Sequence, residues 1–345
     1  MPRRPRIARH TDIATALSLL SDRELADLVA SGTPNGQGVG GRSTLIEVGG
    51  VRVFVKRVPL TDTERLPEHV RSTANVFALP PFFHYGIGLV ASPGLGAWRE
   101  LAAHTMTTNW VLSDRFSGFP LLHHWRVLPD IPRPLPDELA DVERAVAYWG
   151  GTPQVRERIE GRRTASANLA LFLEYIPHTV HDWLETRLEA GAADTAVPFV
   201  EQGLEAVLSF LHTRELLHLD AHFENILTDG HRLYLTDYGL SLSARYRLTP
   251  EERDFVGRHR HYDRAYTRSY LVVWLVTALY GYRGQERDAF IRGCAGGERP
   301  DGIPEAAADV IARHAREAVV MGEFNRRFQE ESRLTPYPPP SPHAP

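Results

Sequence analysis

The chain has 345 residues, of which 43% are hydrophobic and 24% charged, a composition typical of a globular protein of one or two domains. Its formal net charge of −4 provides no basic excess for nucleic acid or an anionic membrane, so we expect neither as a partner. The single cysteine, Cys294, excludes an intrachain disulfide and a cysteine-based zinc site, and favours a reducing, cytoplasmic location. Of the 39 lysine and arginine residues, only Lys56 is a lysine. Lys56 is therefore a candidate for a position at which arginine cannot replace lysine.

The N-terminal part, residues 1–31, is predicted to be a basic arm followed by a helix. Residues 1–10 are rich in arginine and proline, and we expect them to be flexible. A helix is expected over residues 11–30. It contains a capping box of Ser21 and Glu24 and is stopped by Gly32.

A glycine-rich loop and a β-hairpin follow. The loop SGTPNGQGVGG contains the spacing Gly-x-Gly-x-x-Gly at Gly36, Gly38 and Gly41. The hairpin is indicated by alternating apolar residues on both sides of a Gly49-Gly50 turn, and Lys56 lies on its second strand.

Residues 32–174 are predicted to form a first lobe. A helix is expected over residues 94–112, with apolar residues on one face, and strands over 119–128 and 166–176. Two further stretches, 60–92 and 129–165, read as insertions.

The second half, residues 175–334, is predicted to be mainly helical. Its longest apolar run, 271–280, is about half of what a membrane-spanning helix needs. Helices are also expected over residues 180–190, 267–281 and 303–331. Two more helices are expected, one after Pro198 and one that begins at a cap at Thr249. A hairpin is expected at Asp229-Gly230. The proline-rich tail, 335–345, is expected to be disordered. A strand-rich first half and a helical second half predict an α+β protein with two lobes.

The strongest motif lies in this second half. The pattern is His218-x-Asp220-x4-Asn225, and Asp237-x-Gly239 follows twelve residues after the asparagine. Taken singly, these residues could serve in turns, where Asp and Asn are common. The combined spacing resembles the catalytic and metal-binding loops of the protein-kinase-like superfamily, which includes Ser/Thr protein kinases and aminoglycoside and choline kinase-like phosphotransferases.

This resemblance implies a bilobal kinase-like fold, with a small antiparallel-sheet lobe and a mainly helical lobe, and a reaction that uses ATP and Mg²⁺. Asp220 would accept the proton of the attacking hydroxyl. Asn225 and Asp237 would hold Mg²⁺, and His222 would stabilise the transferring phosphoryl group by hydrogen bonding. The alternative is a set of ordinary turn residues.

The same resemblance implies nucleotide contacts in the first lobe. Gly36, Gly38 and Gly41 precede a hairpin, as in kinases, whereas a dinucleotide fingerprint needs a helix after it. Lys56 would contact the α- and β-phosphates and pair with a helix glutamate. Glu100 is the candidate for that partner.

Some of these assignments leave alternatives open. The glycine loop could be a plain surface loop, and Lys56 an exposed strand lysine. Glu64 and Glu68 are rivals of Glu100, because 43 residues separate Lys56 from Glu100. A further assignment rests on position alone: Glu174 and Ile176 fall where the backbone of the interlobe hinge would meet adenine.

The acceptor is expected to be a small-molecule hydroxyl. His222 resembles the small-molecule branch, and no Ala-Pro-Glu follows Asp237-Tyr238-Gly239. A Ser/Thr peptide is the second candidate, since residues 245–268 carry seven arginines, although a solvated face balanced by nearby acids accounts for them more simply. These acids are Glu251, Glu252, Asp254 and Asp263. A pseudokinase is a third possibility, disfavoured because the lysine, base and metal ligands are all present.

Overall fold

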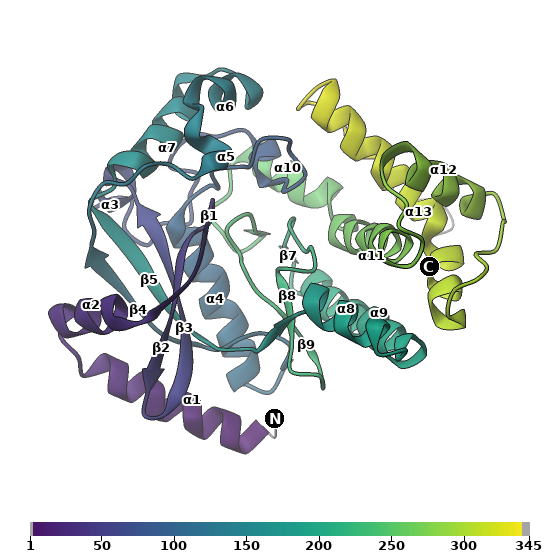
Figure 1. The fold of residues 1–345 in the computed structure, drawn as a ribbon. Helices are drawn as coiled ribbons and strands as arrows, with labels where there is room; N and C mark the ends of the chain where they lie inside the picture. The colour runs from purple at the N-terminus through teal and green to yellow at the C-terminus, as the bar shows by residue number, and fades with distance from the viewer. Residues whose placement is uncertain (1–2, 340–345) are drawn as a thin grey trace. The chain divides into compact units, whose positions relative to one another are not determined.

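The chain forms an α+β structure of two compact units. The computed structural model describes residues 3–339 (Figure 1). The first unit comprises Met1–Ile176 and Thr236–Arg253, and the second comprises Pro177–Leu235 and Asp254–Pro345. The first boundary lies two residues beyond the predicted one at 174. The return of residues 236–253 to the first unit differs from the prediction, which placed them with the second half of the chain.

A five-stranded antiparallel sheet forms the centre of the first unit, with the strand order β1-β2-β3-β5-β4. The strands are β1 (Thr33–Gly38), β2 (Gly41–Val48), β3 (Val51–Leu60), β4 (Leu122–Pro129) and β5 (Ala167–Glu174). The predicted hairpin is confirmed, because Val48 pairs with Val51 across Gly49-Gly50 and both glycines have positive φ. The predicted glycine loop is partly wrong. Residues 33–38 pair with β2 as a strand, and only Val39 and Gly40 form the turn.

Two N-terminal helices cover one face of this sheet (Figure 1). They are α1 (Arg3–Ser18) and α2 (Asp22–Ser31). The prediction of a flexible arm is therefore wrong for residues 3–10. The apolar residues of α1, Ile13 and Leu17, are buried against β2 and β3, and this burial stabilises the helix. The predicted capping box at the start of α2 is confirmed, with reciprocal Ser21–Glu24 hydrogen bonds, and Gly32 ends the helix.

The opposite face of the sheet packs against helix α4 (Ala97–Leu112). Trp98 and Leu101 of this helix contact Val58 and Leu60 of β3. Alternate residues of β3 therefore face different helices, as expected of a strand buried on both sides. This places Lys56 on the α4 face of the sheet.

The segments 60–92 and 129–165 are folded and pack against each other within the first unit. They contain α3 (Asp62–Arg65), the 3-10 helix η1 (Pro81–His84), α5 (Asp137–Ala140), α6 (Val142–Tyr148) and α7 (Pro153–Thr164). The ring centroids of Phe83 and Trp149 are 4.8 Å apart. The guanidinium of Arg158 lies 4.8 Å from the ring centroid of Phe77. These contacts join the two segments into one subdomain beside the sheet.

The second unit is mainly helical, as predicted. Its helices are α8 (Val180–Glu189), α9 (Ala193–Thr213), α11 (Tyr262–Tyr280), α12 (Gly284–Ala295) and α13 (Glu305–Glu330). Its short strands are β6 (His178–Thr179), β7 (Leu216–Leu217), β8 (Ile226–Thr228) and β9 (Leu233–Leu235). The hairpin predicted at Asp229-Gly230 is confirmed by the pairing of β8 with β9. Among residues 3–339, no helix combines the length and apolar character needed to cross a membrane.

Two elements remain, one within the 236–253 segment and one that begins at its end. Strand β10 (Leu242–Ser243) precedes helix α10 (Pro250–Arg258), and the cap predicted at Thr249 is confirmed by its reciprocal hydrogen bonds with Glu252. The expectation of an unpacked tail is wrong for its first residues. Thr335 is buried, and the Tyr337 ring lies 5.0 Å from that of His259. The rest of the predicted tail, residues 340–345, lies outside the described part of the chain.

Candidate functional site

The lone lysine lies between two carboxylates in the first unit. The Lys56 Nζ atom is 2.7 Å from Glu100 Oε1 and 2.8 Å from Asp237 Oδ1. Burial opposes the charged form of the ammonium, but Asp237 and Glu100 outweigh this effect and raise the pKa of Lys56. Burial also raises the pKa of Glu100, against the effect of the lysine. The buried ammonium of Lys56 on β3 is therefore fixed in place by one carboxylate from α4 and one from the segment after β9.

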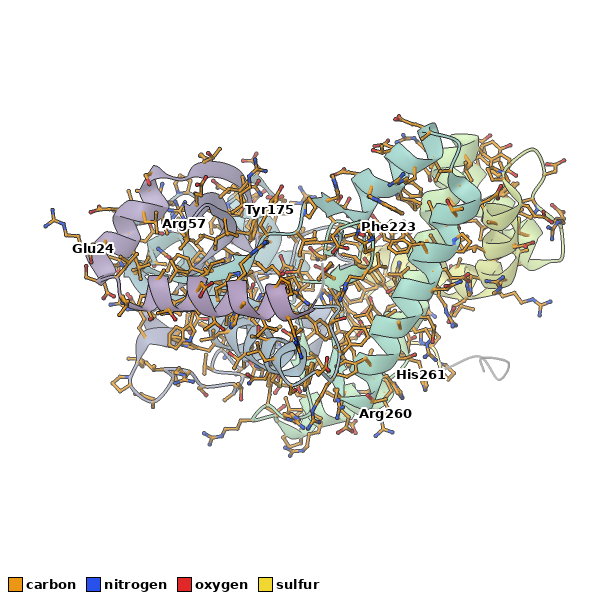
Figure 2. The ribbon with its side chains drawn as sticks, turned by 90° about the horizontal axis from the view of Figure 1, so that it is seen from below. Glu24, Arg57, Tyr175, Phe223, Arg260 and His261 are labelled. Carbon is orange, nitrogen blue, oxygen red and sulfur yellow. The ribbon has the colours of Figure 1, made fainter. Side chains whose placement is uncertain are left out.

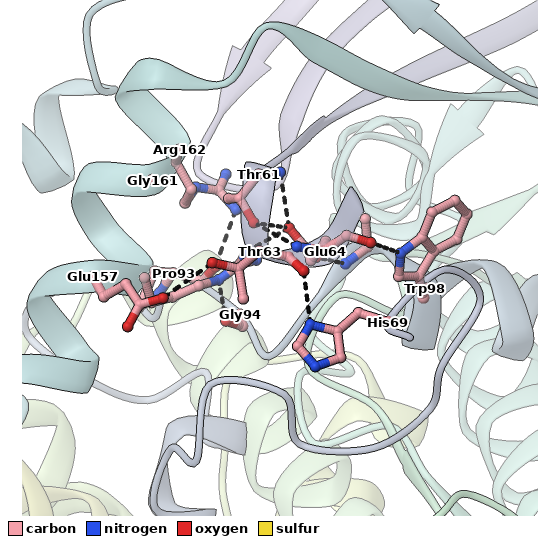
Figure 3. Close-up of polar contacts among 12 residues, drawn as sticks. Thr61, Thr63, Glu64, His69, Pro93, Gly94, Trp98, Glu157, Gly161 and Arg162 are labelled. Carbon is pink, nitrogen blue, oxygen red and sulfur yellow. Dashed lines mark hydrogen bonds and ion pairs between the residues drawn. The ribbon is translucent and has the colours of Figure 1, made fainter. Parts of the chain in front are cut away.

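The structure distinguishes Glu100 from the other two glutamates that the sequence left open. Glu68 is exposed. Glu64 is buried, but its carboxylate accepts hydrogen bonds from the Thr61 N–H and the Ala97 N–H and pairs with Arg158 (Figure 3 shows its neighbourhood). Since Ala97 is the first residue of α4, Glu64 satisfies one of the free N–H groups at the helix start. Glu64 thus supports the helix that carries Glu100.

The segment after Asp237 is attached to α4 by a second buried ion pair. Arg99 Nη1 lies 2.7 Å from Glu252 Oε1, with both side chains almost fully buried. The hydroxyl of Tyr246 donates to the Arg99 carbonyl at 2.9 Å, and the Tyr238 ring meets the edge of His104, with centroids 4.8 Å apart. These contacts hold Asp237 in register with Lys56 and Glu100.

Asp237 itself has an unusual backbone conformation. Its φ of 60° lies in the left-handed region, which residues other than glycine seldom adopt and which is often retained at functional sites. The Oδ1 atom also accepts a weak hydrogen bond from the Gly239 N–H at 3.3 Å. The carboxylate is therefore oriented by its own loop as well as by Lys56.

The turn between β1 and β2 lies against the lysine. A Cβ added to Gly40 would be 3.1 Å from Lys56 Nζ, and one added to Gly41, at φ 138°, would be 2.3 Å from the Arg57 carbonyl oxygen. Only glycine allows the backbone to approach this closely. Of the three predicted nucleotide-binding glycines, Gly41 is thus constrained by packing, whereas Gly38 has open space around it and Gly36 has only the Ser43 hydroxyl nearby. Gly40, which the motif did not include, is the glycine at the lysine.

The predicted hinge residues lie at the end of the first unit. The Glu174 carboxylate pairs with Arg6 of α1 at 2.6 Å, and the Glu174 N–H donates to the Leu121 carbonyl at 2.8 Å. The Glu174 N–H is therefore engaged within the first unit, and the adenine contact of the Glu174 and Ile176 backbone stays a prediction. Ile176 is buried, with 9% of its surface exposed.

The predicted catalytic loop belongs to the second unit. The Asn225 side-chain nitrogen donates to Asp220 Oδ2 at 3.2 Å and to the Asp220 carbonyl at 3.0 Å. His222 Nδ1 is 2.7 Å from Glu224 Oε2, and His222 Nε2 is 3.7 Å from Asp220 Oδ2. Asp220, His222 and Asn225 are thus brought together, and Glu224 orients the imidazole.

A carboxylate that the sequence analysis assigned to a solvated face supports this loop. Asp263, near the start of α11, is 6% exposed and accepts hydrogen bonds from the His218 and Leu219 N–H groups, both at 2.7 Å. Leu219 has a φ of 67°, which is unfavourable for a bulky residue. Burial raises the pKa of Asp263 to about 6 against the two backbone hydrogen bonds. Nothing in the neighbouring sequence signals this role.

The other acids and the arginines of residues 245–268 divide between the surface and the interior. Glu251 and Asp254 are exposed, as expected, but Glu252 is fully buried in the ion pair with Arg99. All seven arginines in this range are exposed or half-buried. The simpler interpretation, a solvated basic face, therefore agrees with their placement, whereas two of the four acids have structural roles.

The two residues predicted to hold Mg²⁺ each carry an oxygen ligand of the type that this ion prefers. Among residues 3–339, no group of three or more His, Cys, Asp and Glu side chains is placed to hold a metal ion. Mg²⁺ is commonly bound through one or two protein oxygens, with phosphates and water completing the shell. Asp237 offers a carboxylate, and Asn225, which contacts Asp220 through its side-chain nitrogen, offers an amide oxygen. These chemical types fit the predicted metal role.

Comparisons with known proteins identify no family. No protein-family model matches the chain, and no curated protein matches it significantly.

Proposed function

We propose that this protein is an ATP-dependent phosphotransferase that moves the γ-phosphoryl group to a hydroxyl, with a small molecule as acceptor. The observation that carries the proposal is Lys56 held between Glu100 and Asp237 at 2.7 and 2.8 Å. These residues come from three distant parts of the sequence. A buried ammonium fixed by two carboxylates is suited to contact nucleotide phosphates while a neighbouring carboxylate binds Mg²⁺.

The second unit supplies the groups that would act on the acceptor. Asp220 would accept the hydroxyl proton, and Asn225 would contribute an oxygen to the metal. His222, oriented by Glu224, would donate a hydrogen bond to the transferring phosphoryl group. Mg²⁺, when bound, would neutralise charge on the phosphates. A compact imidazole, where protein kinases carry a lysine, supports a small-molecule acceptor.

The β1–β2 turn would contact a nucleotide bound at this site. The backbone at Gly40 lies beside the ammonium, so a phosphate bound to Lys56 would lie next to this turn. Arg162 of α7 donates a hydrogen bond to the Val39 carbonyl in this turn and so fixes the position of the turn. We therefore expect nucleotide binding to change hydrogen exchange at the turn amides.

The proposal is tested first by nucleotide binding. Mg-ATP should raise the melting temperature of the wild-type protein by mass action. Lys56→Arg keeps the charge but replaces a compact ammonium with a planar guanidinium, and should abolish most of this shift and of any transfer while leaving the protein folded. Arg52→Lys, an exposed change on the same strand, is the matched control. A wild-type protein with no Mg-ATP shift would refute the nucleotide site.

The acceptor is tested with γ-labelled ATP and a cell lysate. Label should enter the small-molecule fraction and be lost with Asp220→Asn. Label in the protein fraction instead would favour the second candidate, a Ser/Thr protein or peptide kinase. The exposed arginines of residues 245–268 would suit an acidic peptide. Mg-ATP binding without any transfer would favour a regulatory nucleotide-binding protein.

A further inference from the structure

A small pocket lies next to the β1–β2 hairpin in the first unit. It is lined by the hairpin residues Gly38 and Arg42, by Asp130 and Arg133 from the segment after β4, and by Arg162 from α7. Its volume is about 50 Å³, which is room for about four water molecules. A pocket of this size admits a phosphate-sized group and is too small for a nucleotide.

Two strand residues of this pocket, Arg42 and Pro59, are on the face of the sheet opposite to Lys56. Arg42 pairs with Arg57 across the β2–β3 ladder, and cross-strand partners share a face. Arg57 follows Lys56 directly, so the two side chains point to opposite faces. Pro59, which also lines the pocket, is on the Arg57 side. Lys56 therefore does not line the pocket. Arg57 is labelled in Figure 2.

Positive charge around the pocket is incompletely balanced. Asp130 pairs with Arg42 and lies 3.5 Å from Arg133. Burial lowers the pKa of Arg57, and the neighbouring Arg42 and Arg133 lower it further. Three guanidinium groups thus surround one carboxylate. An additional anion would relieve the repulsion among them.

A fourth arginine adds positive charge at the pocket wall. Arg162 is 8% exposed, and its Nε is buried without a hydrogen-bond partner. Its other nitrogens donate to the carbonyls of Val39 and Pro93 (Figure 3 shows Arg162 and Pro93). Burial and the nearby Arg158 lower its pKa to about 9. The buried positive charge of Arg162 therefore favours an anion in the pocket that it lines.

We propose that this pocket is a binding site for a phosphate-sized oxyanion. Arg133 and Arg42 supply guanidinium groups, which bind phosphate through paired N–H donors. Arg162 adds the charge of a buried guanidinium at the pocket wall, and the small volume sets the size of the anionic group. The site uses neither Lys56 nor the catalytic loop, but it shares Arg162 with the β1–β2 turn that lies against the lysine.

The probe is inorganic phosphate, titrated by calorimetry into the full chain at constant ionic strength. Saturable binding is expected for the wild type. Arg133→Gln should weaken it about tenfold or more, the effect of losing one charge-assisted interaction. Arg133 is about half exposed, so the variant should fold, and its melting temperature verifies this. Arg163→Gln, an exposed neighbour of Arg162 on α7, is the control that should bind as the wild type does.

A second variant separates this pocket from the lysine site. Lys56→Arg should retain phosphate binding whether or not the protein binds Mg-ATP. The proposal is overturned if the wild type shows no saturable phosphate binding or if Arg133→Gln binds phosphate as the wild type does. It is also overturned if Lys56→Arg loses phosphate binding while Arg133→Gln retains it. Titration with glycerol 3-phosphate then identifies the source of the anion. Tighter binding than inorganic phosphate indicates an organic phosphate monoester, and weaker binding indicates the free ion.

Discussion

The two sets of candidate catalytic residues are built in different ways. In the first unit, Lys56, Glu100 and Asp237 are far apart in the sequence and meet in a buried cluster. In the second unit, Asp220, His222 and Asn225 lie within six residues of one another and meet through contacts inside one loop. The first set depends on the packing of the whole unit, whereas the second depends on the conformation of a single loop.

This difference separates the effect of a substitution on the proposed reaction from its effect on the folding of the first unit. If the proposed function holds, a change in the loop should remove a reacting group and leave the fold intact. A change in the buried cluster or its supports disturbs the packing that brings three segments together. The following predictions use this contrast, beginning with the largest expected effect.

Asp220→Asn should lower phosphoryl transfer by about 10²- to 10⁴-fold, because the amide cannot accept the hydroxyl proton. Mg-ATP binding and the melting temperature should be unchanged, since Asp220 is partly exposed and takes part in a local loop contact. The measurements are transfer from labelled ATP and a thermal-shift titration. Loss of nucleotide binding along with turnover would show that the loop is not separable in this way.

Arg99→Met should lower the free energy of unfolding by about 3 to 5 kcal/mol, because it leaves the buried Glu252 carboxylate unpaired. Denaturant unfolding gives the magnitude. Hydrogen exchange should show the loss of protection in α4 of the first unit and not in α11 of the second. The double variant Arg99→Met with Glu252→Gln should recover part of the stability. Equal loss in both units would contradict the contrast.

Asp263→Asn tests the support of the catalytic loop through pH. The pKa of Asp263 is raised from 3.8 to about 6, so the folded state holds this proton more tightly than the unfolded state does. The wild type should therefore lose stability from this group as the pH rises from about 4 to about 6, on the order of 2 to 3 kcal/mol. The asparagine variant should lack this dependence. Parallel pH profiles for the two proteins would exclude the shift.

Arg156→Gln should have the smallest effect. Arg156 bonds to Glu143 through both terminal nitrogens, but the pair is solvent-exposed. Surface ion pairs contribute little to stability. Melting curves and transfer rates should match those of the wild type, in contrast to Arg99→Met. A clear loss of stability would mean that the 129–165 segment supports the sheet more strongly than its burial indicates.

Local signals in the sequence predicted most of the elements correctly. The capping boxes at Ser21 and Thr249 and the Gly49-Gly50 hairpin depend on residues close in sequence, so composition and spacing reveal them. The first half of α1, residues 3–10, was missed because it is rich in arginine and proline, and burial of Ile13 and Leu17 farther along the helix outweighs that local preference.

In the candidate site, too, some residues were predicted from the sequence and others were not. Glu100 was predicted as the partner of Lys56, and the ion pair is present. The supports of the site were missed, because Glu64, Arg158 and Arg162 acquire their roles only when the two inserted segments fold together. Asp263 was taken for a surface acid, since nothing near it in the sequence indicates that it accepts hydrogen bonds from a loop more than forty residues earlier.

The return of residues 236–253 to the first unit has a consequence for synthesis of the protein on the ribosome. Lys56 and Arg99 emerge early, but their partners Asp237 and Glu252 follow more than 130 residues later. Domains generally fold as their residues become available. The first unit cannot complete its buried charge pairs until most of the chain has been translated, so we expect the nascent N-terminal part to remain incompletely folded through much of elongation.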